Sequence, residues 1–189
     1  MTCNRRGVVI GVVMAALAWA APDHIAIAQS QEPSSLLILP RAAERNDFDS
    51  VVSVMQRGDY VDTEGEDRRT ALSFAAANGN MQIVDFLLGH QAGVDRRDRF
   101  GNTALHWAAM NGHADMIKRL LAAGAAIDRQ NGEGTTPLMY AITNNRTLAV
   151  RALVDAGADV HIQDYTGHDA LSWAQGKPTI LPIVQRGAH

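Results

Sequence analysis

Apolar and small residues recur along this chain with a period of 33 positions, and the recurrence predicts most of its secondary structure. Each period holds two short apolar segments with helical spacing, such as residues 103–111 and 114–122. Glycine or asparagine stands between them, at Gly79, Gly112 and Asn145, and both residue types suit a left-handed helix end. The recurring columns are Leu72, Leu105, Leu138 and Leu171; Ala42, Ala75, Ala108, Ala141 and Ala174; Val51, Val84, Ile117, Val150 and Ile183. The pattern therefore predicts helical hairpins stacked in series, an all-α repeat solenoid.

The residues of each period resemble the ankyrin repeat. Residues 103–108 read T-A-L-H-W-A and residues 136–141 read T-P-L-M-Y-A, close to the T-P-L-H-x-A opening of that family. Gly112-His113 and Gly124-Ala125 continue the resemblance, which extends over residues 36–189. It implies that each unit is a β-turn finger followed by two antiparallel helices. It also implies protein binding through the concave face of fingers and first helices, and no reaction.

We expect five units, with degenerate units at both ends that act as caps. In the first unit we expect helices over residues 41–46 and 48–57, and no finger. In the last unit Pro178 takes the position between the helices, and Pro182 falls in the first turn of a short helix over residues 180–185. The expected units are residues 36–65, 66–98, 99–131, 132–164 and 165–189.

The N-terminus carries the layout of a secretory signal peptide, which we place at residues 1–28. Two arginines precede an apolar run over residues 7–21, and an A-x-A site follows at residues 26–28. We expect cleavage near Ala28/Gln29, with cleavage after Ala20 as the alternative. An uncleaved membrane anchor is the other alternative, but a spanning helix needs about 20 apolar residues and this run is shorter. Residues 29–35 are expected to form a flexible lead-in, and the mature protein to be periplasmic or secreted.

Composition changes the picture once the leader is removed. Cys3 is the only cysteine, so a mature chain would have no thiol to mispair in an oxidising compartment. Losing Arg5, Arg6 and Asp23 from 17 basic and 20 acidic residues leaves 15 and 19. That balance argues against nucleic-acid binding, which depends on clustered Lys and Arg. We expect a monomer that binds another protein, with no cofactor and no membrane contact after leader cleavage.

Few residues have the setting that catalysis requires. His106 stands in the family's histidine position, so the resemblance implies that it ties down a finger by hydrogen bonds. No Ser or Cys nucleophile has a surrounding motif, and 132–134 lacks the later residues of a phosphate-binding loop. We therefore predict that the chain is not an enzyme. The alternative is a metal-handling protein or enzyme that uses the residues of the last finger: His161, Asp164, His168 and Asp169.

The predicted binding surface combines finger residues with an aromatic column. Phe74, Trp107, Tyr140 and Trp173 recur at intervals of 33, and two interpretations stay open: packing between units, or a row of anchors for a partner. The cluster of Arg96, Arg97, Arg99 and Phe100 offers guanidinium groups beside an aromatic ring. The partner protein could be one that this chain inhibits, confers immunity to or helps to assemble. The predicted partner-binding residues are Arg69, Arg97, Arg99, Phe100, Asn102, Trp107, Met110, Asn111, Glu133, Tyr140, Thr143, Asn144, Tyr165, His168 and Trp173.

Overall fold

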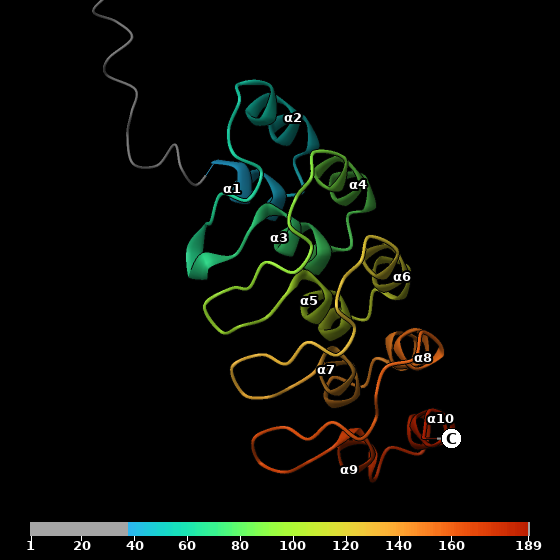
Figure 1. Cartoon of the computed structure of the whole chain (residues 1–189). Helices are drawn as coiled ribbons and strands as arrows, with labels where there is room; N and C mark the ends of the chain where they lie inside the picture. Colours follow the sequence, from blue (N-terminus) through green and yellow to red (C-terminus); the bar gives the residue numbers. More distant parts are fainter. Residues whose placement is uncertain (1–37, 189) are drawn as a thin grey trace, which may run out of the picture. The chain divides into compact units, whose positions relative to one another are not determined.

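The computed structural model describes residues 38–188, which form two rows of helices with loops projecting to one side (Figure 1). These residues lie in one compact unit. The predicted leader and lead-in, residues 1–35, lie outside the described residues. The first helices of the units are α1 (Ile38–Glu44), α3 (Ala71–Asn78), α5 (Ala104–Asn111), α7 (Pro137–Thr143) and α9 (Ala170–Ala174). The second helices are α2 (Phe48–Gln56), α4 (Met81–Gly89), α6 (Ala114–Ala122), α8 (Thr147–Asp155) and α10 (Leu181–Arg186), and a short 3-10 helix, η2, covers Glu66–Arg68.

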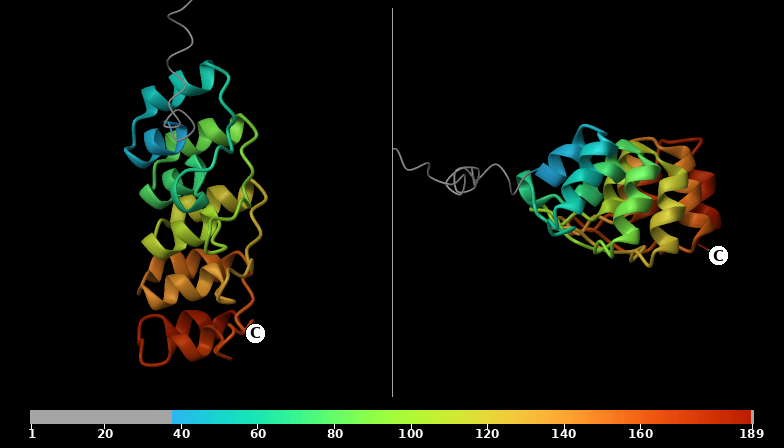
Figure 2. Two further views of the ribbon diagram at one scale, coloured as in Figure 1. Left: turned by 90° about the vertical axis from the view of Figure 1, so that its left-hand side faces the viewer. Right: turned by 90° about the horizontal axis from the view of Figure 1, so that it is seen from above.

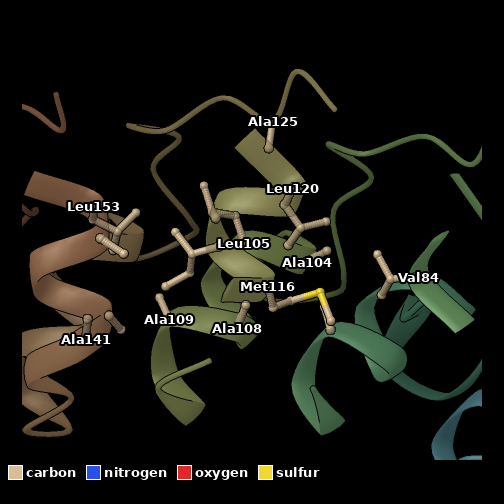
Figure 3. Packing of buried hydrophobic residues seen from close by; sticks show 14 of the residues in the cluster. Val84, Ala104, Leu105, Ala108, Ala109, Met116, Leu120, Ala125, Ala141 and Leu153 are labelled. Atoms are coloured by element: carbon tan, nitrogen blue, oxygen red, sulfur yellow. The ribbon is translucent and has the colours of Figure 1, made fainter. Parts of the chain in front are cut away.

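The first helices pack against one another in sequence order, from α1 to α9. Ala75, Ala108 and Ala141 are fully buried along this row, and their small side chains let neighbouring helices approach closely. Each second helix packs on the first helix of its own unit. Figure 3 shows Leu105 of α5 and Leu120 of α6 pointing into the space between the two rows. The core is therefore continuous from unit to unit, as a repeat solenoid requires.

The predicted turn residues between the helices have left-handed backbones. Gly79 and Gly112 have φ angles of 73° and 87°, and Asn145 has a φ of 57°. Asn46 has a φ of 59° at the corresponding place in the first unit, which the sequence pattern did not indicate. In each case the left-handed residue ends one helix and turns the chain toward the next.

Polar ties join each unit to the next on the loop side. Asp62 accepts hydrogen bonds from the backbone N–H of Gly93, 31 residues later, and Asp95 does the same for Ala126. Asp128 continues the series. At the turns, His113 Nε2 lies 3.0 Å from the carbonyl oxygen of Ala77 in the preceding unit. Such hydrogen bonds contribute roughly 1 kcal/mol each and fix the angle between units.

The end units depart from the internal ones. The first helix begins at Ile38 instead of the expected residue 41, so Pro40 lies within its first turn, where its missing N–H costs no hydrogen bond. The expected final helix is confirmed as α10, with Pro182 in its first turn. Helix α9 has only five residues, since Gln175 leaves the helical conformation. Among residues 38–188, no helix is long and apolar enough to cross a membrane.

Candidate functional site

An open groove of about 720 Å³ lies between two fingers and the helices α5 and α7. We call it the central groove. The fingers, seen face-on at the left of Figure 2, follow one another along one side of the stack. They comprise residues 64–69, 97–102, 130–135 and 163–168. The central groove is lined by Arg68, Arg97, Asp98, Arg99, Phe100, Gly101, Asn102, Trp107, Met110, Asn131, Gly132, Glu133 and Tyr140.

One carboxylate organises the 97–102 finger and the aromatic residue behind it. Asp98 Oδ1 accepts hydrogen bonds from the backbone N–H groups of Phe100 and Asn102, at 2.9 and 2.8 Å. Its other oxygen, Oδ2, accepts a hydrogen bond from Trp107 Nε1 at 3.0 Å. The same side chain therefore shapes the finger and fixes the plane of the indole ring.

The arrangement recurs in the next two fingers. Asn131 Oδ1 accepts from two backbone N–H groups of its own finger, and Asn131 Nδ2 donates to the hydroxyl of Tyr140 at 3.1 Å. Asp164 Oδ2 accepts from Trp173 Nε1 at 2.8 Å. Burial would raise the pKa of Asp164, but hydrogen bonds from Thr166, from the backbone of His168 and from Trp173 outweigh it and lower the pKa to about 2. The spacing of nine residues is visible in the sequence at all three places.

Backbone hydrogen bonds also tie each finger to the next. The N–H of Arg99 donates to the carbonyl of Asp67, that of Gly132 to Phe100, and that of Tyr165 to Glu133. Gly101 and Gly134 have positive φ angles, and a side chain at Gly134 would collide with Tyr165. The finger walls of the central groove are therefore held in place before any ligand arrives.

The buried histidine has the structural role that was predicted for it. His106 Nδ1 accepts a hydrogen bond from the backbone N–H of Thr103 at 3.1 Å, so the proton is on Nε2, which donates to the carbonyl of Thr135. Burial lowers the pKa of His106 to about 4, against hydrogen bonding that would raise it. A neutral imidazole thus joins α5 to the 130–135 finger.

A family model described as ankyrin repeats (three copies) matches the chain over residues 39–131, 90–164 and 108–186. Together these matches cover nearly all the residues that form the two rows of helices. The chain belongs to the ankyrin repeat family. Ankyrin repeats are in general protein–protein interaction modules, and proteins built from them are typically not enzymes. No curated protein matches the chain.

The ankyrin fold places the aromatic column partly within the core and partly in the central groove. Phe74 is buried, whereas Trp107 and Tyr140 are half-buried and line the groove. Trp173 is 37% exposed. Packing between units thus accounts for Phe74, while Trp107 and Tyr140 also present ring surface to a ligand.

The arginine cluster of the 97–102 finger is less free than the sequence predicted. Arg96 pairs with Glu64. Arg97 donates from Nε to the carbonyl of Gly101 at 3.2 Å and from Nη2 to the carbonyl of Gln130 at 3.1 Å, so it is a brace between fingers. Arg99 reaches Asp67 at 3.4 Å and stays largely exposed.

Phe100 and Arg99 at this finger have most of their surface free for a partner. Phe100 is 55% exposed at the fingertip. Arg99 lies beside it with most of its surface in solvent. Arg97 also lines the groove and is exposed, so its role in binding stays a prediction, but two of its nitrogens already donate to backbone carbonyls.

Asn102 lines the central groove, but its side chain is mostly covered, so its role in binding stays a prediction. It is only 5% exposed, and its Oδ1 accepts a hydrogen bond from Asn131 Nδ2 at 2.9 Å. Its position in the finger was predicted correctly, but its side chain turns inward and links two fingers. The sequence gives no indication of this direction.

The remaining predicted residues fall into three places. Met110, Glu133 and Tyr140 line the central groove. Asn111, Thr143 and Asn144 lie at the C-terminal ends of α5 and α7, where each donates a hydrogen bond to a carbonyl of its own helix. Tyr165, His168 and Trp173 belong to the last finger and helix α9, outside the central groove.

The last finger does not form the metal site considered as an alternative. Asp164 accepts hydrogen bonds from the backbone of its own finger and from Trp173. Asp169 caps α9 by accepting a hydrogen bond from the N–H of Ser172. His168 Nδ1 lies 2.8 Å from the hydroxyl of Thr166. Over the described residues, no group of three or more His, Cys, Asp or Glu side chains is placed to hold a metal ion.

Proposed function

We propose that this chain is an exported ankyrin repeat protein that binds another protein in its central groove. It acts as a monomer, without a cofactor or a catalytic step of its own. The observation that carries the proposal is the combination of Trp107 and Tyr140, half-buried in a groove of about 720 Å³, with Phe100 exposed at its rim. Aromatic side chains of this kind supply much of the binding energy at protein interfaces.

The stiffness of the groove supports the same proposal. Asp98 and Asn131 each hold two backbone N–H groups of their fingers, and Arg97 bridges the two fingers. The conformational entropy of the groove residues is therefore lost on folding and not on binding. This raises the affinity for a partner.

Charge favours a protein over a nucleic acid as the ligand. The three arginines that line the groove already meet acceptors, with Arg68 on Glu64, Arg97 on carbonyls and Arg99 on Asp67. Binding to phosphates draws its free energy from released counterions around unpaired basic groups.

The binding proposal is tested by comparing exposed residues inside and outside the groove. The purified repeat domain, in wild-type form and as Phe100→Ala/Arg99→Ala, is used to capture proteins from the envelope fraction of the source cell. Leu148→Ala is the matched control, since Leu148 is 66% exposed on α8 in the other row of helices. We expect the double variant to lose the captured protein while its melting temperature changes little, and Leu148→Ala to retain it. Loss in the control alone would contradict the proposal.

Export is proposed from the leader pattern and is tested separately. Residues 1–35 are fused to a reporter enzyme that is active only outside the cytoplasm, with Val13→Arg interrupting the apolar run as the control. We expect activity from the native leader alone, and a mature N-terminus at Gln29 or Ala21. Equal activity of both fusions would contradict export by this leader.

A further inference from the structure

One arginine beside the groove is held between two aromatic rings. The guanidinium carbon of Arg69 lies 4.0 Å from the ring centre of Phe74 and 3.9 Å from that of Trp107. Arg69 directly precedes Thr70, the N-cap residue of α3, so its backbone is fixed. Because both faces of the guanidinium are covered, a ligand can approach only in its plane, along the edge that carries the N–H donors.

The hydrogen-bonding capacity of this arginine is unused. Arg69 Nε is buried without a hydrogen-bond partner, and none of the ion pairs found among residues 38–188 involves Arg69. The neighbouring arginines differ: Arg68 pairs with Glu64 at 2.9 Å, and Arg99 pairs with Asp67 at 3.4 Å. A buried donor without an acceptor is costly to a folded protein, so the Nε–H of Arg69 calls for an acceptor.

The surroundings leave the positive charge available to a ligand. Burial lowers the pKa of Arg69 from its usual value, opposed by the nearby carboxylates of Asp98, Glu44 and Asp67. Asp98 already accepts three hydrogen bonds and Asp67 meets Arg99, so neither carboxylate turns to the stacked guanidinium.

We propose that Arg69 binds the carboxylate of an aspartate or glutamate side chain in the partner protein, at the edge of the central groove that Trp107 shares. This inference rests on the proposed function. A planar guanidinium stacked on aromatic rings and approached in its plane matches the two oxygens of a carboxylate. A side chain fits better than a chain end, because α1 lies on one side of this finger and further fingers follow on the other (Figure 1), so a partner segment can run past this point.

The test uses random dodecapeptides displayed on phage and selected on the purified repeat domain. Peptides that lose binding to Phe100→Ala/Trp107→Ala are retained as groove ligands and synthesised with amidated C-termini. We expect each to contain an acidic residue whose change to its amide weakens binding about tenfold in the wild-type protein. In Arg69→Gln the same peptide change should have little effect, and in Arg99→Gln it should keep its full effect.

The outcomes separate this inference from the function on which it rests. Groove-dependent peptides whose affinity is indifferent to the acid-to-amide change would overturn the role of Arg69 and leave the binding groove standing. A requirement for a free C-terminal carboxylate would overturn the assignment to a side chain. Selected peptides that bind without regard to Phe100 and Trp107 would overturn the proposed function, and this inference with it. Because each comparison is made within one protein variant, a change in stability on replacing Arg69 does not affect it.

Discussion

The 97–102 and 163–168 fingers are anchored in the same way to the first helix of the third unit and of the last unit, and the central groove is built around the first of these anchors. In both, an aspartate holds the finger and accepts a hydrogen bond from a tryptophan nine residues later: Asp98 with Trp107, and Asp164 with Trp173. Trp107 is covered by Arg69 of the preceding finger and lines the groove with Tyr140 of the following unit. Trp173 has no further finger beyond it among the described residues, and its ring stays more exposed. The difference shows that the binding surface is a property of neighbouring units and not of a single repeat.

The two units also differ in rigidity. Helix α5 has eight residues and ends at the left-handed Gly112, whereas α9 has five and ends in an extended residue, Gln175. Fewer helical hydrogen bonds and neighbours on one side only make the last unit the one that opens first.

The largest expected effect comes from the pH dependence of the buried histidine, which the last unit replaces with Ser172. The pKa of His106 is about 4 in the folded protein and about 6.5 when unfolded. At neutral pH both states are uncharged; as the pH falls from about 6.5 to 4, the unfolded chain takes up the proton first and the native state loses about 3 kcal/mol. Urea unfolding of the wild type and of His106→Ser across this range measures the difference. If the free energy of unfolding fell equally with pH in both proteins, the burial of His106 would have no such cost.

Overpacking the alanine column should distinguish the two regions next. Ala108 and Ala174 are both fully buried at corresponding positions, but α5 has helices on both sides and α9 only on one. We expect Ala108→Leu to lower the free energy of unfolding by about 3 kcal/mol and Ala174→Leu by about 1 kcal/mol, since the end helix can shift outward. Denaturant unfolding of both variants checks this. Equal losses would mean that the last unit is packed as tightly as the third.

A smaller effect is expected from the finger anchor itself. Asp98→Asn would direct an amide N–H at the indole N–H of Trp107. We expect it to lower the free energy of unfolding by about 2 kcal/mol, because the partly buried indole donor loses its acceptor. The chain already contains the compatible pair, Asn131 with Tyr140. We therefore expect Trp107→Tyr to recover part of the loss in the double variant.

The control for the variants at positions 98 and 107 is Asp164→Asn in the last finger. There the exposure of Trp173 lets water replace the lost hydrogen bond. Its expected cost is below 1 kcal/mol, in the range typical of exposed hydrogen bonds. A double-mutant cycle by thermal unfolding gives the coupling between positions 98 and 107. Additive losses at these positions would contradict the proposed anchor.

The features that the sequence predicted well depend on local pattern. The period of 33 residues located the helices, and the left-handed residues Gly112 and Asn145 follow from their place between two helices. The hydrogen bonds of His106 followed from the family resemblance. These features recur in every unit or belong to the repeat itself, so neighbouring copies reinforce each prediction.

The direction of long polar side chains was not predictable in this way. Arg97 and Arg99 stand two positions apart in one finger and are both exposed, yet the first donates to two backbone carbonyls and the second reaches a carboxylate of the preceding finger. The stacking of Arg69 between two rings depends on residues from two units. A flexible side chain with several acceptors in reach is settled by tertiary packing, which a single repeat does not specify.

The most direct test of the central groove places a photoreactive phenylalanine analogue at one position at a time in the full chain within the source cell. Phe100 and Met110 lie at the groove, and Leu148 and Tyr60 are exposed apolar positions outside it. The groove account predicts the same protein adduct from Phe100 and Met110 and none from Leu148 or Tyr60. Adducts from Leu148 or Tyr60, with none from the two groove positions, would contradict it.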